Sequence, residues 1–314
     1  MNPYVSCVLC PHHCKVDRTK GQLGVCGQQD VMNIAWIGLH KGEEPPVSKE
    51  YGSGTIFFTG CSLHCLFCQN EQISSPSSSF HTLVSEQELA VYMIELQSMH
   101  AASINLITGT HFIPSIKKSI IIAKKMGLTI PIVWNSSGFE SIEELALVDE
   151  YIDLYLLDIK TLDEATSSTY CAYRKYPEVI RNVIDYLLST KRKTYIDESG
   201  SLYGFLIRHL VFPSSLSSTY EVLHYFADYL KDVAYLSLMV QFINPHEQSG
   251  ETYISECEYN ELLGVLEELG IEDGFVQELE DNVDWIPDFT LSNPFPSSFA
   301  TPLAHFLEQR ELSQ

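Results

Sequence analysis

The sequence has little positive charge and no long apolar run. It contains 19 lysines and arginines against 41 acidic residues, which gives a formal net charge of −22 at pH 7. A chain with this charge repels a phosphate backbone, so we expect no nucleic-acid partner. No apolar segment approaches the ~20 residues that cross a bilayer, and the first residues do not resemble a signal peptide. We therefore expect a cytoplasmic protein without a membrane partner.

The composition suits a large folded α/β protein. Apolar residues make up 45% of the 314 residues and charged residues 19%, which is enough to bury an extensive core. The nine cysteines predict thiolates that bind metal, because a reducing cytosol does not sustain structural disulfides. Seven of them form two groups near the N-terminus. Cys171 and Cys257 stand alone and are expected to be ordinary packed or surface thiols.

Strand and helix patterns alternate along most of the chain. The predicted strands are 55–59, 103–107, 130–134, 154–159, 205–211, 235–242 and 274–278. The predicted helices between them are 85–99, 113–126, 141–148, 177–188, 218–230 and 255–269, and the first begins with a capping box of Ser85 and Glu88. Six or seven βα units in series predict a parallel sheet with right-handed crossovers, which is a barrel or part of one.

Three regions of the chain differ in composition and sequence pattern. Residues 1–50 combine cysteines with turn-forming residues and predict a small module organised by metal. Residues 51–283 carry the alternating strands and helices of the barrel. Residues 284–314 contain several prolines and predict an irregular tail that wraps the outside.

Cys61, Cys65 and Cys68 follow directly on the predicted strand 55–59, at a strand end where α/β proteins place their active sites. A [4Fe–4S] cluster normally takes four cysteines, so a loop with three leaves one iron open to a small-molecule ligand. S-adenosylmethionine (SAM) can bind there through its amino and carboxylate groups. An electron from the cluster then breaks the S–C5′ bond, and the resulting 5′-deoxyadenosyl radical abstracts hydrogen from a substrate.

This chemistry requires no catalytic base, and none is assigned beyond the cluster. The alternative for the three cysteines is a zinc knuckle, whose fourth ligand would be His64 or a distant group. The close spacing of three cysteines after a glycine-ended strand favours the cluster.

The segment Gly52 to Asn70, GSGTIFFTGCSLHCLFCQN, resembles the cluster-binding motif of the radical SAM superfamily. It is most similar to the motif of the pyruvate formate-lyase activating enzyme-like proteins. The similarity extends over residues 7–285, through EPP at 44–46, TGTH at 108–111, WNSSG at 134–138, LDIK at 157–160 and IRHL at 207–210.

The resemblance implies a partial (β/α)6 barrel, similar to part of a TIM barrel, with SAM across the carboxyl ends of the strands. It implies that Phe67 lies near the adenine and that Thr108, Gly109 and Thr110 lie near the SAM amino group. The remaining residues implied to line the SAM or substrate cavity are Asn135, Ser137, Asp158, Lys160, Arg208 and Gln241. As alternatives, Asp158 or Arg208 would belong to a structural ion pair, and His111 and His209 are expected to be structural.

Cys7, Cys10, Cys14 and Cys26 supply four thiolates within the N-terminal module. Four ligands suit either a structural zinc or a second [4Fe–4S] cluster, and the spacing does not distinguish them. His12 or His13 could replace one cysteine. A second cluster would relay electrons, whereas zinc would fold the module.

The leading functional hypothesis is a radical SAM oxidoreductase that removes hydrogen from a protein or peptide, resembling the activases that install a glycyl radical. Its expected partners are SAM, an electron donor such as flavodoxin or ferredoxin, and a protein or peptide substrate. One alternative keeps the radical chemistry but acts on a small molecule or modifies a peptide. The other is a non-enzymatic interaction protein that carries zinc or an iron–sulfur cluster.

Overall fold

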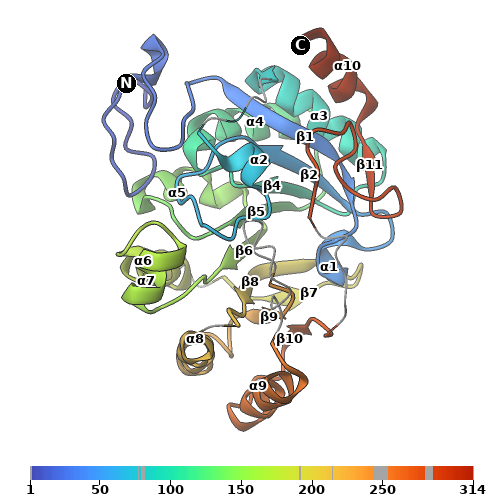
Figure 1. The fold of residues 1–314 in the computed structure, drawn as a ribbon. Helices are drawn as coiled ribbons and strands as arrows, with labels where there is room; N and C mark the ends of the chain where they lie inside the picture. Colours follow the sequence, from blue (N-terminus) through green and yellow to red (C-terminus); the bar gives the residue numbers. More distant parts are fainter. Residues whose placement is uncertain are drawn as a thin grey trace.

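The computed structural model describes residues 2–76, 78, 82–190, 192–213, 215–242, 254–279 and 286–313. Its centre is a curved sheet of parallel strands with helices on the outer face (Figure 1). The parallel strands are β2 (Ser53–Phe58), β4 (Ile104–Ile107), β5 (Ile132–Ser136), β6 (Leu154–Asp158), β8 (Leu202–Leu210), β9 (Tyr235–Met239) and β10 (Gly274–Val276). Their residues are mostly buried, as expected for a parallel sheet covered on both faces.

Most of the helices that connect these strands correspond closely to the predicted ones, but the helix at Glu164–Tyr170 was not predicted. They are α3 (Glu86–Ser98), α4 (Ile113–Met126), α5 (Ile142–Val148), α6 (Glu164–Tyr170), α7 (Tyr176–Ser189), α8 (Leu216–Tyr229) and α9 (Glu256–Glu268). The capping box of Ser85 and Glu88 is present at the start of α3. The predicted partial (β/α)6 barrel is therefore confirmed.

Antiparallel strands extend the sheet at one edge. These are β1 (Met32–His40) beside β2, and β3 (Leu83–Val84) and β11 (Ala300–Pro302) beside β1; a further short strand, β7 (Tyr195–Ile196), pairs with β8. Among the described residues the path runs β10-β9-β8-β6-β5-β4-β2-β1-β11 and does not close. The barrel is thus open between β10 and the β1 edge.

A short helix, α1 (Pro45–Ser48), fills the amino end of the barrel. Its Val47 packs against Val133 and Leu206 on the inner face of the strands, and the carbonyl of Val47 accepts a hydrogen bond from Ser103 Oγ. The larger core lies between the other face of the sheet and the helices. Helix α1 therefore packs at the amino ends of these strands.

The N-terminal module is held to the barrel by Arg18, whose side chain is completely buried. Its Nη1 donates to the carbonyl of His111 at 2.7 Å, and its Nε donates to the carbonyl of Gln28 at 3.0 Å. The guanidinium also lies 4.7 Å from the ring centroid of Tyr4. These contacts dock the module beside the turn that follows β4.

The ends of the chain contain more regular structure than expected. Strand β1 falls within residues 1–50 yet belongs to the sheet, and its nine residues are all buried. The tail, which we expected to be irregular, includes β11 and α10 (Ala304–Ser313). The predicted boundary at 283 lies outside the described residues. No helix in the described part of the chain is both long enough and apolar enough to span a membrane.

Candidate active site

A cavity of about 470 Å³ occupies the interior of the barrel. The cysteine loop Cys61–Cys68, the strand ends and the tail all contribute to its wall. Eight of the predicted cofactor or substrate residues lie in the wall, together with the three loop cysteines: Phe67, Thr108, Asn135, Ser137, Asp158, Lys160, Arg208 and Gln241. The topology therefore brings together side chains from the ends of six strands, β2, β4, β5, β6, β8 and β9.

Gly109 and Thr110 do not line this cavity. The Oγ1 of Thr110 donates to Glu140 Oε1 at 2.9 Å, and the residue is buried. A Cβ built on Gly109 would lie 2.6 Å from Cδ1 of Ile116, so this side of the glycine faces α4. Thr108 is the one residue of this turn in the wall, and its φ of +58° is rare for a β-branched residue.

The cysteine loop begins where β2 ends and turns sharply at Gly60, whose φ is +77°. The N–H of Gly60 donates to the carbonyl of Ile73 at 2.8 Å, and the N–H of Cys68 donates to the carbonyl of Cys65 at 3.2 Å. Burial raises the pKa of the Cys61 thiol to about 12 and also raises the pKa of Cys68. A thiolate in this loop therefore needs a cation beside it.

An ion pair forms the wall next to the loop. Lys160 Nζ lies 2.7 Å from Asp158 Oδ2 and 5.8 Å from the ring centroid of Phe67. Burial alone would lower the pKa of Lys160, but the carboxylate of Asp158 and the nearby Cys65 raise it above its ordinary value. The ammonium therefore stays charged beside the loop. The alternative role of Asp158 in an ion pair thus coexists with its place in the cavity wall.

Strands β9 and β10 supply a pair of glutamines to the wall. Gln277 Nε2 donates to Gln241 Oε1 at 2.9 Å, and Gln277 Oε1 accepts from the backbone N–H groups of Val240 and Gln241. Gln241 Nε2 also donates to the carbonyl of Glu278 at 3.3 Å. Gln241 was among the predicted cavity residues and Gln277 was not, because the sequence of β10 is a weak strand signal without a motif.

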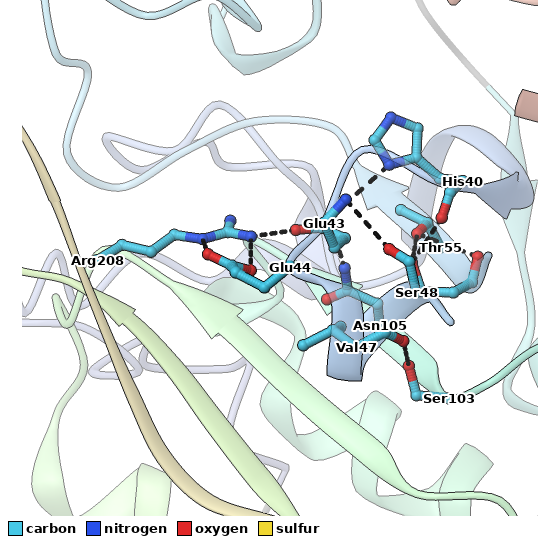
Figure 2. Close-up of polar contacts among 10 residues, drawn as sticks. His40, Glu43, Glu44, Val47, Ser48, Thr55, Ser103, Asn105 and Arg208 are labelled. Carbon is cyan, nitrogen blue, oxygen red and sulfur yellow. Dashed lines mark hydrogen bonds and ion pairs between the residues drawn. The ribbon is translucent and has the colours of Figure 1, made fainter. Parts of the chain in front are cut away.

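Figure 2 shows a buried acidic pair around Arg208 at the bottom of the cavity. Arg208 Nε lies 2.8 Å from Glu44 Oε1 and Nη2 lies 2.6 Å from Glu44 Oε2, while Nη2 also pairs with Glu43. Burial would raise the pKa of Glu44, but Arg208 lowers it below its ordinary value. The carboxylate is therefore ionised, and Arg208 has the ion-pair role named as its alternative.

Glu43 continues this network toward β1. Its Oε1 accepts from Asn105 Nδ2 at 2.8 Å and lies 3.9 Å from His40 Nδ1 (Figure 2). Burial lowers the pKa of His40, which favours the neutral ring. The sequence analysis noted EPP at 44–46 without assigning it a role. What it could not reveal is that α1 enters the barrel and turns both glutamates toward Arg208.

The tail completes the wall where the sheet is open. Phe295 lies in the cavity wall, and its ring is 5.4 Å from Trp36 and 5.6 Å from Phe57. Gln72 in α2 (Glu71–Ser74) joins the tail to the cysteine loop, because its Oε1 accepts from the N–H of Phe289 at 2.7 Å. Proline content alone did not reveal this role.

The two histidines expected to be structural are buried and hydrogen bonded. His111 Nε2 lies 2.8 Å from the carbonyl of Thr59, and His209 bridges the carbonyl of Ile159 and Thr219 Oγ1 at 2.7 and 3.0 Å. Burial lowers the pKa of His111 to about 3 and that of His209 to about 4. Both rings are therefore neutral at pH 7.

The four N-terminal cysteines gather beside the cysteine loop. Burial, and then the neighbouring thiols of Cys26, Cys14 and Cys7, raise the pKa of Cys10 to about 12. All four are free thiols. Among the described residues, no group of three or more histidine, cysteine and acidic side chains is arranged to hold a single metal ion.

Two histidines connect the module to the loop. His12 Nε2 lies 2.7 Å from the carbonyl of Ser62, and His64 Nε2 lies 2.8 Å from the carbonyl of Val25. A Cβ on Gly60 would meet the carbonyl of Cys26 at 2.5 Å. The two cysteine groups therefore belong to adjoining, tightly packed segments.

Residues 55–205, which contain the cysteine loop and strands β4 to β6, match the family model of the radical SAM superfamily. This part of the chain is therefore similar to the radical SAM superfamily. It is 27% identical over 247 residues to the uncharacterized protein MJ0674 of Methanocaldococcus jannaschii, a match that covers 77% of this chain and 67% of that protein.

Two solved structures show the same fold as this chain. One is anSMEcpe with bound AdoMet, with 15% identity and a TM-score of 0.50 over 69% of this chain and 60% of the other. The second is a radical SAM methyltransferase from Sphaerobacter thermophilus, with 13% identity and a TM-score of 0.50 over 72% and 66%. The chain thus spans less than two thirds of each of these structures.

The radical SAM match implies a [4Fe–4S] cluster and SAM, and the donor set of the cavity fits both. The loop supplies three thiols and no fourth cysteine, and all three lie in the cavity wall. Charged and amide side chains of Asp158, Lys160 and Asn135 lie in the same wall. The residues present therefore suit a cluster with one iron accessible to a polar ligand.

Proposed function

We propose that this radical SAM protein cleaves SAM reductively and removes a hydrogen atom from a protein or peptide, as the glycyl-radical activases do. The observation that carries the proposal is the position of the three loop thiols in the wall of one cavity. When bound, the [4Fe–4S] cluster supplies the electron that divides SAM into methionine and a 5′-deoxyadenosyl radical. The radical takes a hydrogen atom from the substrate and becomes 5′-deoxyadenosine.

The protein contributes binding, orientation and exclusion of water. Cys61, Cys65 and Cys68 would hold the cluster, and Phe67, which lies in the same cavity wall, would pack against the adenine. The Thr108 N–H donates a 2.9 Å hydrogen bond to the Asn135 carbonyl. This bond keeps the two residues, whose polar side chains belong to the wall, next to each other. The fixed positions of these groups shield the radical from water.

The charged side chains of the cavity wall suit a carboxylate and an ammonium group of the bound molecules. Lys160 is a cation beside the loop and can receive the SAM carboxylate, while Asp158 and Glu43 can receive an ammonium. A cavity of about 470 Å³ falls within the range of about 300–1,000 Å³ for small-molecule sites. The cavity therefore has room for SAM and a limited part of a substrate. This size favours a flexible peptide segment as the substrate, and not the surface of a folded protein.

The proposal is tested by anaerobic reconstitution with iron and sulfide, reduction with dithionite and addition of SAM. We expect 5′-deoxyadenosine and methionine in equal amounts. A C61A/C65A/C68A variant should give neither product, and C257A, which removes an exposed thiol on α9, should match the parent protein. A parent protein with an intact cluster that produces no nucleoside would contradict the proposal.

The substrate class needs a separate measurement. Candidate glycine-containing peptides labelled with deuterium are incubated with the reduced protein and SAM, and deuterium in 5′-deoxyadenosine is measured by mass spectrometry. Transfer from a peptide supports the activase-like reaction. Transfer only from small metabolites would favour the alternative reaction on a small molecule.

The N-terminal cysteines are proposed as a second metal site, with zinc and a second [4Fe–4S] cluster as the alternatives. Their packing against the loop through His12 and His64 supports a relay that receives electrons from flavodoxin or ferredoxin. A zinc site would instead stabilise the module. Because both metals need thiolates, a reducing cytoplasmic location is part of this proposal.

A further inference from the structure

The cavity wall beside α1 carries more negative than positive charge. Glu43 and Glu44 share the guanidinium of Arg208 (Figure 2). Asp158, the other carboxylate in the described part of the wall, has its own partner in Lys160 at 2.7 Å. A carboxylate that is removed from water costs free energy unless a cation compensates it. The wall beside α1 can therefore accept one further positive charge.

The atoms around Glu43 show where that charge fits. Glu43 Oε2 pairs with Arg208, and Oε1 accepts from Asn105 Nδ2 at 2.8 Å. His40, which is 9% exposed, has its Nδ1 3.9 Å from the same Oε1, which is too long for a hydrogen bond. Within the described residues, neither His40 Nδ1 nor the buried Oδ1 of Asn105 has a hydrogen-bond partner. A neutral imidazole can accept at Nδ1, so acceptors without a donor gather at this carboxylate.

Aromatic rings adjoin these acceptors in the cavity wall. The ring centroid of Phe295 is 4.5 Å from that of His40 and 5.6 Å from that of Phe57. Phe57, Phe295 and Phe299 all line the cavity. Such rings pack against the methylene stem of a long side chain and attract a cation to their faces. This part of the wall therefore suits a ligand with an apolar stem and a cationic end.

Most of this surface comes from segments outside the superfamily match. His40 and Glu43 precede residues 55–205, and Phe295 and Phe299 follow them. The matched residues carry the cysteine loop, on which the radical chemistry depends. The segments around them are therefore suited to select the substrate.

We propose that Glu43, His40 and Phe295 form a subsite that binds a lysine side chain of the peptide substrate, with its ammonium at Glu43 and its methylene stem along Phe295. This inference rests on the proposed function and names its substrate class more closely. An ammonium has three N–H donors and no acceptor, which suits a carboxylate surrounded by unused acceptors.

An arginine side chain fits this subsite less well than lysine. A guanidinium prefers to bind both oxygens of a carboxylate through parallel hydrogen bonds. Both Glu43 oxygens already have a partner, Asn105 on one side and Arg208 on the other. The compact ammonium needs only one of them.

The test measures peptide binding to the full chain, reconstituted anaerobically and supplied with SAM but not reduced. Capped peptides with a central glycine carry one lysine at each other position in turn. Matched sets carry arginine, or norleucine, which has the same carbon chain without the ammonium. Equilibrium dialysis gives the Kd of each peptide for the parent protein, E43Q, H40F and E267Q, a control on the exposed side of α9.

We expect the best lysine peptide to bind the parent protein about tenfold more tightly than its norleucine counterpart, since a hydrogen bond to a charged group is lost. The arginine peptide should lie between them. In E43Q the preference for lysine should nearly disappear, in H40F it should decrease, and in E267Q it should remain. Because each preference is a ratio within one variant, partly unfolded protein affects both Kd values alike.

Equal binding of the lysine and norleucine peptides to the parent protein, or binding of neither, would overturn the inference. A parent-like preference for lysine in E43Q would overturn it too, as would a preference for arginine over lysine. Failure of the proposed function gives a different result. In that case the reduced parent protein forms no 5′-deoxyadenosine, whichever peptide it binds.

Discussion

Arg208 and Glu44 form two parallel hydrogen bonds at the bottom of the barrel cavity, Nε to Oε1 at 2.8 Å and Nη2 to Oε2 at 2.6 Å. The pair is mostly buried, with 14% of the Arg208 side chain and 8% of the Glu44 side chain exposed. Removing the guanidinium would leave Glu43 and Glu44 as uncompensated carboxylates. We expect Arg208→Met to lower the free energy of unfolding by about 3–5 kcal/mol, measured by urea denaturation.

An exposed pair provides the control for this prediction. Arg174 and Glu164 are 2.9 Å apart, but their side chains are 73% and 58% exposed. Arg174→Met should therefore cost only about 0–1 kcal/mol. Equal losses in the two variants would contradict the assignment of Arg208 as a buried structural charge.

Gly60 connects the N-terminal module to the cysteine loop through close contact. Its φ is +77°, and an added Cβ would lie 2.5 Å from the carbonyl oxygen of Cys26. We expect Gly60→Ala to push the two cysteine segments apart and reduce the iron bound after reconstitution by more than half. Iron content and the absorbance of the cluster measure this effect.

The matched control is Gly200, which has a φ of +81° and nothing within 4 Å of a built Cβ. Gly200→Ala carries the backbone strain of about 1–2 kcal/mol without the steric contact. It should bind as much iron as the parent protein. Equal iron loss in both variants would mean that the positive φ, and not the contact with Cys26, is responsible.

The buried ring of His209 makes the fold sensitive to acid. Its pKa is lowered to about 4, against about 6.5 for an unfolded histidine, because burial disfavours the charged ring. Above pH 6.5 both states are neutral and this stabilisation is complete. As pH falls from about 6.5 to 4, the unfolded state gains a proton that the native state excludes, and about 3 kcal/mol of stability is lost.

Free energies of unfolding at pH 7, 6 and 5 test this expectation. His209→Gln should reduce the pH dependence, although it lowers stability at pH 7 by removing one of the hydrogen bonds to Ile159 and Thr219. His224→Gln, on the exposed side of α8, should leave the dependence unchanged. A parent-like slope in His209→Gln would rule out this histidine as the source.

Metal analysis of a C10S/C14S variant distinguishes the two N-terminal alternatives. If the module binds a second cluster, the variant should lose about four irons per chain and keep the cluster of the loop. If it binds zinc, about one zinc should be lost with iron unchanged. Loss of neither metal would contradict a metal site in the module.

The parts of the fold with periodic patterns were predictable from the sequence. Helix α4 was predicted at residues 113–126 and is observed at Ile113–Met126, because its apolar face repeats clearly and Gly127 ends it with a φ of +103°. Strand β1 was not predicted, because its sequence has no such repeat. All nine of its residues are buried, so the run shows none of the alternation that identifies a strand with one exposed face.

The cavity was predictable at the strand ends and not elsewhere. Asp158 and Lys160 follow a strand in a recognisable motif, so their place in the wall could be anticipated. The contacts of Glu43 and the position of Cys171 depend on tertiary packing, namely the entry of α1 into the barrel and the docking of α6 on the loop. Neither event leaves a local pattern in the sequence.

The pairing of β11 with β1 affects the order of events during protein synthesis. Gly38 lies opposite Pro302, so β1 can pair with β11 only after the chain has been translated as far as residue 302. Phe295 and Phe299 reach the cavity wall at the same late stage. Until these residues are synthesised, this side of the cavity lacks the part of its wall that they provide.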